Sequence, residues 1–128
     1  MRYLFVAMLC LVLATPAAAM DWLGERAPAF VQSLQQMINA DQREAIAQQV
    51  VYPLTVDGQA SIADQAAFLQ AYDAIFTKDV RQCVAGQDTS QNMQAIQSSY
   101  MIGWGCIWFD ELLDGGGIGI WAVNTRAD

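Results

Sequence analysis

The spacing of apolar positions predicts two helices between residues 28 and 50. Behind Pro28, apolar residues recur every three or four positions, which predicts an amphipathic helix over residues 28–40 with the proline in its first turn. The apolar stripe of this helix consists of Phe30, Val31, Leu34, Met37 and Ile38. A shorter helix is predicted to follow, because Asp41 and Glu44 have the spacing of a capping box.

A second apolar stripe predicts a longer helix that opens at the segment Ser61 to Asp64. Thr77 is predicted to act as a new N-cap, after which the chain continues for one or two more helical turns. Gly86 is predicted to end these turns. The stripe of the long helix consists of Phe68, Leu69, Tyr72, Ile75 and Phe76.

The remaining apolar runs are predicted as strands. The stretch from Tyr52 to Val56 contains Pro53, which cannot donate to a ladder, so it is predicted as an edge strand that ends at the turn Asp57-Gly58. The runs at residues 104–109 and 118–123 flank a glycine-rich connection and predict a hairpin.

Helices followed by strands in one short chain predict an α+β fold, with the helices packed on one face of an antiparallel sheet. Alternation in the strand 104–109 predicts one face with Trp104, Cys106 and Trp108 and another with Gly105, Ile107 and Phe109. The second face needs cover. A homodimer through the sheet would supply it, and so would the polar segment 87–99, which is predicted as a loop with a short strand at 93–96.

The N-terminal residues have the order of a secretory signal peptide. Arg2 precedes an apolar run of about a dozen residues, and a small-residue site follows Pro16, which predicts cleavage after Ala19. The run is shorter than the roughly 20 residues that span a bilayer, so no stable membrane insertion is expected after cleavage. We therefore expect a periplasmic or secreted protein with a signal peptide at 1–19 and a single domain at 20–128.

The charge of the chain is strongly acidic. The whole chain has a formal net charge of −7, and without Arg2 the predicted domain has five basic and thirteen acidic residues, a net charge of −8. Such a surface repels phosphate backbones and no basic stripe offsets it, so nucleic-acid binding is not expected. Basic partners are favoured by this charge, although it also serves simply to keep an exported domain soluble.

Two cysteines remain after the leader, Cys83 and Cys106. An even number of cysteines in an oxidising compartment predicts a disulfide, which would close a loop of 22 intervening residues and stabilise the fold by roughly 3 kcal/mol. A buried pair of free thiols and a redox site are the alternatives, and the absence of CxxC spacing disfavours the redox site.

Candidate catalytic and metal-binding chemistry is sparse, because the chain has no histidine. This excludes Ser-His and Cys-His machinery and leaves Asp73 and Asp110 as weak candidates for acid-base work. Asp110, Glu111 and Asp114 precede a run of glycines, but their spacing matches no calcium loop or phosphate-binding loop. We expect no metal and no cofactor, and we favour a protein that is not an enzyme.

The aromatic residues offer a candidate ligand site. A pocket for a small apolar ligand would be lined by Tyr72, Trp104, Trp108 and Trp121. The alternative is that these rings form an aromatic core, since each large ring buries well over 100 Å².

Two segments carry a resemblance to a known superfamily. FLQAYDAIFTKDVR, residues 68–81, and MIGWGCIWFD, residues 101–110, resemble elements of small bacterial periplasmic proteins of the NTF2-like (SnoaL-like, cystatin-like) superfamily. The resemblance implies N-terminal helices packed on a curved sheet, with a cone between them that often holds a ligand. Enzymes of the superfamily commonly place an Asp-His pair in that cone, and this chain lacks the histidine.

Three hypotheses about function follow. The first is a non-catalytic binding domain for a small apolar ligand or a protein partner. The second is an acidic periplasmic inhibitor or immunity protein that neutralises a basic cell-wall hydrolase through Asp110, Glu111 and Asp114. The third is an enzyme that works with carboxylates alone.

Overall fold

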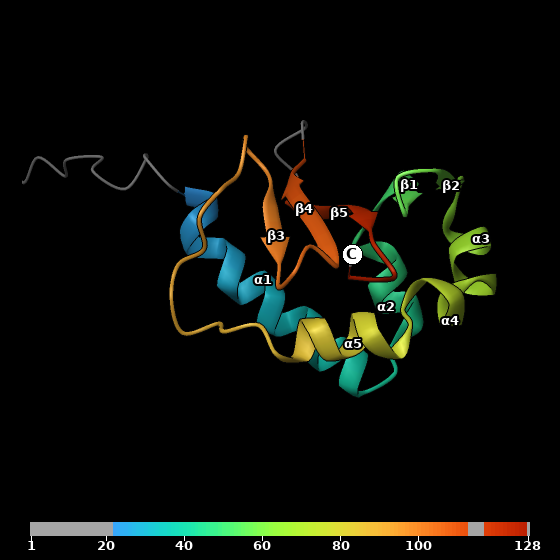
Figure 1. Cartoon of the computed structure of the whole chain (residues 1–128), viewed down its shortest axis with the longest axis horizontal. Helices are drawn as coiled ribbons and strands as arrows, with labels where there is room; N and C mark the ends of the chain where they lie inside the picture. Colours follow the sequence, from blue (N-terminus) through green and yellow to red (C-terminus); the bar gives the residue numbers. More distant parts are fainter. Residues whose placement is uncertain (1–21, 113–116, 128) are drawn as a thin grey trace, which may run out of the picture.

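The computed structural model describes residues 22–112 and 117–127 and shows an α+β fold (Figure 1). Five helices and five strands are present in this part of the chain. They follow the order α1 (Trp22–Asn39), α2 (Arg43–Gln48), β1 (Val50–Val56), β2 (Ala60–Ile62), α3 (Gln65–Gln70), α4 (Tyr72–Ile75), α5 (Lys78–Ala85), β3 (Tyr100–Ile102), β4 (Ile107–Glu111) and β5 (Ile118–Val123).

The five strands form one mixed sheet in the order β2-β1-β5-β4-β3. Strand β1 pairs with β5 in parallel, and every other neighbouring pair is antiparallel. The prediction of a purely antiparallel sheet is therefore wrong. The helices α3 to α5 and the strands β3 and β4 lie between β1 and β5 in the chain, and this long connection allows the two strands to run in the same direction.

Helices α1 and α5 pack on one face of the sheet, as predicted, and the hydrophobic core lies between the two layers (Figure 1). The rings of Phe30 from α1 and Phe109 from β4 meet at 4.7 Å between centroids, and Tyr100 of β3 stacks on Phe109 at 5.6 Å. The largest buried side chains are Tyr72, Phe68, Phe76, Phe109, Leu34, Ile46, Leu54, Ile102, Ile107 and Ile120.

The first two helices differ from their predicted starts. Helix α1 begins at Trp22, so Pro28 lies inside the helix, where its ring is buried. Tertiary packing of the apolar face outweighs the backbone hydrogen bond that a proline removes. The capping box is also wrong: Asp41 has a φ of 52° and accepts a hydrogen bond from Arg43 Nε at 3.0 Å, and Gln42 occupies the N-cap without a side-chain bond.

Strand β1 is not at an edge, because β2 covers one side and β5 the other. Pro53 is tolerated because the register between β1 and β5 shifts between Val50 and Thr55, while pairing with β2 starts only at Leu54. The turn Asp57-Gly58 is confirmed, with φ values of 53° and 71°, and it leads into β2. Sequence patterning missed β2 and placed the start of a helix there instead.

The long helix predicted after Ser61 is three short helices, α3, α4 and α5. Asp64 caps the first, accepting a hydrogen bond from the Ala67 N–H at 2.9 Å. Thr77 caps α5 as predicted, accepting from the Val80 N–H at 3.3 Å, and Gly86 follows the last turn. The extended backbone that Thr77 needs as a cap is what interrupts the apolar stripe.

The run of residues 100–110 is a hairpin and not one strand. Gly103 and Gly105 have φ values of 53° and 99°, so the chain turns between β3 and β4. This turn shifts the alternation, and Ile107 and Phe109 face the helices together with Cys106. The predicted grouping of Trp104 and Trp108 with Cys106 is therefore wrong.

The segment 87–99 contains no strand at 93–96, only an isolated bridge between Ile96 and Ser99. The segment runs along the outside of the molecule from the end of α5 to the start of β3 (Figure 1). Since the helices already cover Ile107 and Phe109, neither this segment nor a second copy is needed for that purpose.

Candidate functional site

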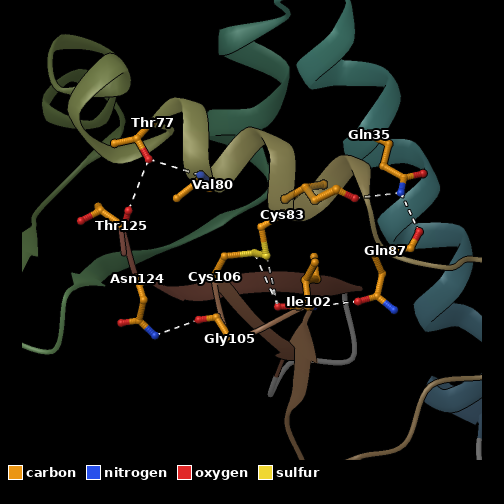
Figure 2. Close-up of a disulfide and its surroundings, with 12 residues drawn as sticks. Gln35, Thr77, Val80, Cys83, Gln87, Ile102, Gly105, Cys106, Asn124 and Thr125 are labelled. Atoms are coloured by element: carbon orange, nitrogen blue, oxygen red, sulfur yellow. Dashed lines mark hydrogen bonds between the residues drawn. A yellow bond between two sulfur atoms is a disulfide. The ribbon is translucent and has the colours of Figure 1, made fainter. Parts of the chain in front are cut away.

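Cys83 of α5 and Cys106, the residue directly before β4, form the predicted disulfide, with Cα atoms 6.5 Å apart (Figure 2). The bridge ties the helix layer to the sheet beside the turn between β3 and β4. Gly103 lies against it, and a Cβ atom at this position would come within 2.6 Å of Cys83 Sγ. Only glycine fits both this close approach and the positive φ of the turn.

The residues after β5 connect two turns at the same end of the sheet. The side-chain amide of Asn124 donates to the Gly105 carbonyl at 2.8 Å (Figure 2), and its backbone N–H donates to the Cys106 carbonyl at 2.9 Å. Thr125 donates to both carboxylate oxygens of Asp57, each at 2.7 Å, through its backbone N–H and its hydroxyl. The β1-β2 turn and the β3-β4 turn are thereby held together.

Trp104 stands in this β3-β4 turn and is 40% exposed. An open hollow of about 550 Å³ lies on one side of Trp104. A second hollow of about 310 Å³ lies on its other side, toward α5. The first hollow is lined by Asp57, Gln59, Trp104, Asn124 and Arg126, and the second by Asp79, Gln82, Cys83, Trp104 and Ala127. Trp104 is the side chain that the two hollows share.

The sheet face opposite the helices carries an apolar stripe across four strands, formed by Met101 of β3, Trp108 of β4, Trp121 of β5 and Val51 of β1. We call these four residues the open-face stripe. Val51 is 37% and Trp121 39% exposed, while Met101 and Trp108 are half-buried. The Trp108 and Trp121 rings meet at 6.0 Å between centroids.

Backbone features place the side chains of the stripe. The register of β4 and β5 shifts at Trp108 and Phe109, which pair with Ala122 and Ile120, so Trp121 has no cross-strand partner in this ladder and turns toward Trp108. Gly105 leaves room for the sulfur of Met101 and the indole of Trp108, each of which a Cβ atom would approach within 3.6 Å.

Tyr72 of α4 lies in the core and is 1% exposed. Its ring stacks on Phe76 at 5.3 Å, and the guanidinium of Arg43 lies 4.5 Å from the ring centroid. The hydroxyl is buried without a hydrogen-bond partner in the described part of the chain. Burial raises the pKa of Tyr72, and the negative charge of Asp41 acts in the same direction.

The two candidate catalytic carboxylates lie in different layers of the molecule. Asp73 is exposed on α4 and forms an ion pair with Arg43 at 3.2 Å. Asp110, on β4, accepts hydrogen bonds from the Ser99 hydroxyl at 3.3 Å and from the Glu111 N–H at 2.7 Å. Neither faces the other, so the structure brings no acid-base pair together from these residues.

Among the described residues, no group of three or more His, Cys, Asp or Glu side chains is arranged to hold a metal ion. Asp114, which was considered with Asp110 and Glu111, lies outside the described residues. The two acidic residues that are described follow one another at the end of β4.

The four aromatic residues predicted to line one pocket lie in three places. Tyr72 is in the core, Trp104 is at the end of the sheet, and Trp108 and Trp121 belong to the open-face stripe. Sequence patterning missed Val51 and Met101, the other members of the stripe, and Asp57, Gln59, Asn124 and Arg126, which surround Trp104. The turn signal at Asp57 was visible, but its place next to Trp104 depends on the parallel pairing of β1 and β5.

Comparison of the chain with protein-family models, with curated proteins and with solved structures finds no match. None of the helices in the described part has the length and apolar content needed to span a membrane. The function therefore has to be inferred from the geometry of the molecule itself.

Proposed function

We propose that the chain is an exported, non-catalytic binding domain whose open-face stripe receives a protein partner with basic residues around the contact. The observation that supports this most is the stripe itself: two tryptophans, a methionine and a valine lie on one sheet face that the helices leave open. Aromatic residues and methionine are enriched in the cores of protein interfaces, where large side chains exclude water.

The filled interior favours a protein partner over a small apolar ligand. Apolar ligands bind in concave sites that bury most of their surface. Between the helices and the sheet, the rings of Phe68, Tyr72 and Phe76 pack on one another with centroids 5.3 to 6.0 Å apart. The open-face stripe lies outside this filled core, on a sheet surface that suits another protein.

Charge favours a basic partner. Alternation in β4 puts Asp110 on the same face as Trp108, and Glu111 follows it at the exposed end of the strand. With a net charge of −8 for the predicted domain, long-range attraction favours a basic surface and disfavours a second copy of this chain. A homodimer through the sheet is therefore the competing occupant that an experiment must distinguish.

The absence of a catalytic arrangement in the described residues supports a binding role. The chain has no histidine, both cysteines of the predicted domain are in the disulfide, and Asp73 and Asp110 lie apart. A disulfide is typical of exported proteins, which agrees with the predicted signal peptide at residues 1–19. A periplasmic or secreted location is part of the proposal.

We also propose membership of the NTF2-like superfamily. The resemblance implies two helices, one short strand, a long helix and then the sheet. The described part of the chain has two helices, the strands β1 and β2, three further helices and then three strands, an order that supports this proposal in outline. The interior differs from a ligand-holding cone because the chain's own aromatic rings occupy it.

Photo-crosslinking in the producing cells tests the partner. We would introduce p-benzoylphenylalanine at Trp121, in the stripe, and as a matched control at Gln48, an exposed residue at the end of α2. The proposal expects one main product at position 121, none at position 48, and a basic protein as the partner identified by mass spectrometry. A product of two copies of this chain, or no product at 121, would reject the proposed occupant.

Binding of the purified partner then separates apolar from electrostatic contact. Trp121→Ala is expected to weaken binding about tenfold or more at any salt concentration, and Asp110→Lys is expected to weaken it mainly at low salt. If the partner is a hydrolase, inhibition of its activity by this chain distinguishes an immunity protein from other binding roles.

A further inference from the structure

We propose that the two hollows around Trp104 form a binding site for a neutral oligosaccharide. The site lies at the end of the sheet and not on the open-face stripe, so it is a second binding surface and does not depend on the protein partner. Four observations carry it: the exposure of the indole, the rigidity of the turn that holds it, the chemistry of the side chains around it, and the presence of a hollow on each of two sides.

The turn that carries Trp104 is fixed before any ligand arrives. On its C-terminal side, Cys106 is bonded to Cys83 of α5, and Asn124 holds the carbonyl of Gly105 at 2.8 Å (Figure 2). Within the turn, the N–H groups of Gly105 and Cys106 donate to the Ile102 carbonyl at 2.9 and 3.2 Å. An aromatic ring that is 40% exposed on so constrained a backbone is preorganised for contact, which lowers the entropic cost of binding.

The side chains around the indole are planar and polar. They supply two carboxylates, three carboxamides and a guanidinium, from Asp57, Asp79, Gln59, Gln82, Asn124 and Arg126. Such groups donate and accept hydrogen bonds in pairs at fixed geometry, which suits neighbouring hydroxyls on a sugar ring. The indole offers a flat apolar surface for the C–H face of the same ring.

Several of these groups have hydrogen-bonding capacity to spare. The side chains of Gln59, Gln82 and Arg126 form no hydrogen bond with a described residue, and the amide of Asn124 donates to Gly105 while its oxygen points away (Figure 2). Asp57 is different, because Thr125 already holds both of its oxygens. It serves to position the tail that brings Asn124 and Arg126 to the hollow.

Two adjoining hollows favour a chain of sugars over a single one. The hollows measure about 550 and 310 Å³ and share Trp104, while Asn124 and Arg126 of the tail line the first and Ala127 lines the second. The larger volume falls within the range of about 300–1,000 Å³ that is typical of small-molecule sites. A linear oligosaccharide that crosses the indole would place sugar units in both.

The lining disfavours other ligand classes. An apolar ligand would leave the carboxylates and amides unpaired on burial. An anion such as a nucleotide would meet Asp57 and Asp79 against the single cation Arg126. A cation such as a polyamine meets one aromatic ring rather than a cage of several, with Arg126 beside it.

Isothermal titration calorimetry of the disulfide-bonded full domain tests the site. The probes are chitotetraose, cellotetraose and maltotetraose, three neutral tetrasaccharides, with spermidine as the cationic competitor. We expect at least one tetrasaccharide to bind, Trp104→Ala to weaken that binding about tenfold or more, and Gln59→Ala to weaken it several-fold. Trp121→Ala is the matched control, since Trp121 is 39% exposed and lies on the open-face stripe, and it should leave the affinity unchanged.

Circular dichroism would confirm that each variant is folded, and Trp104→Phe should restore part of the affinity if a flat ring is what the ligand needs. The proposal is overturned if none of the three tetrasaccharides binds at about 10 mM. At this concentration even a ligand with a Kd of a few millimolar would be detected. It is also overturned if binding is equally strong in Trp104→Ala, or if spermidine binds in place of the sugars.

Discussion

The two faces of the sheet are built from alternate residues of the same strands, yet they have opposite surroundings. In β4, Ile107 and Phe109 are fully buried against the helices, while Trp108 between them is half-buried and lies on the opposite face of the sheet. Both faces are rich in large apolar side chains. Hydrophobicity alone therefore does not tell which face is the core.

The two faces differ in how many neighbouring side chains cover each apolar residue. Phe109 contacts the rings of Phe30 and Tyr100 and is fully buried, whereas Trp121 contacts Trp108 and is 39% exposed. Burial of an apolar side chain stabilises a fold in proportion to the area removed from water. The covered face should consequently carry the stability of the domain, and the open face should carry binding.

The largest expected effect is on the covered face. Phe109→Ala removes a ring that is 0% exposed and leaves a cavity between α1 and the sheet, so the free energy of unfolding should fall by about 3–5 kcal/mol. Urea denaturation followed by circular dichroism measures this change. Trp121→Ala on the open face should lower the free energy of unfolding by less, about 1–2 kcal/mol, because the indole is 39% exposed and its loss removes less buried area together with the aromatic pair with Trp108. Equal losses from the two variants would contradict the division between the faces.

The disulfide joins the covered face to α5, and its loss should have the next largest effect. Replacing both Cys83 and Cys106 with alanine opens a loop of 22 intervening residues, which should reduce the free energy of unfolding by about 3 kcal/mol. Urea midpoints with and without a reductant give the same comparison in the unmodified protein. The effect of Trp121→Ala should add to it independently, because the stripe lies on the other side of the sheet. A reductant that leaves the midpoint unchanged would show that the bridge contributes nothing.

Sequence patterning predicted the features whose signals are local. Thr77 as a cap and Asp57-Gly58 as a turn depend only on a few neighbouring residues, and both are confirmed. The pairing of Cys83 with Cys106 followed from there being two cysteines in the predicted domain. These features need no knowledge of how distant segments pack.

The faces of the sheet could not be predicted in the same way. The prediction treats residues 104–109 as one continuous strand, whereas the turn at Gly103 and Gly105 breaks the alternation before β4 and puts Cys106 on the same side as Ile107 and Phe109. Two glycines in an apolar strand are a sign of a bend, but nothing local gives its size. The parallel pairing of β1 and β5, which brings Asp57 to Asn124 and Thr125, depends on the whole fold.

A smaller effect is expected on the open face at Gly119, where β5 passes beneath Val51 and Leu112. A Cβ atom at Gly119 would collide with Val51 Cγ2 and lie 2.9 Å from Leu112 Cδ2, so Gly119→Ala should destabilise by about 1–2 kcal/mol through overpacking. Gly86→Ala is the matched control, because Gly86 has an ordinary helical φ and its nearest contact would be 3.4 Å. Urea midpoints of the two variants give the answer. If Gly119→Ala is as mild as the control, the side chains above it are free to move and the open face is less ordered than its packing indicates.

The smallest expected effect concerns the hydroxyl of Tyr72, the one buried side-chain polar atom without a hydrogen-bond partner in the part of the chain that the structure describes. Tyr72→Phe keeps the ring against Phe76 and removes a buried group that has no partner among the described residues, so stability at pH 7 should stay the same or rise by up to about 1 kcal/mol. A loss of stability above about 1 kcal/mol would mean that the hydroxyl has a partner such as a bound water.

The same substitution should change the response to alkali. Burial raises the pKa of Tyr72, assisted by Asp41 and opposed by Arg43 and Arg81, so the folded protein keeps this proton to a higher pH than the unfolded chain does. Stability is therefore complete below the ordinary value of 10.0 and falls as the pH rises above it. Urea midpoints between pH 8 and 11 should decline less steeply in Tyr72→Phe. Part of the decline should remain, because burial also raises the pKa of Tyr52, and identical slopes would show that Tyr72 ionises as freely in the folded state as in the unfolded one.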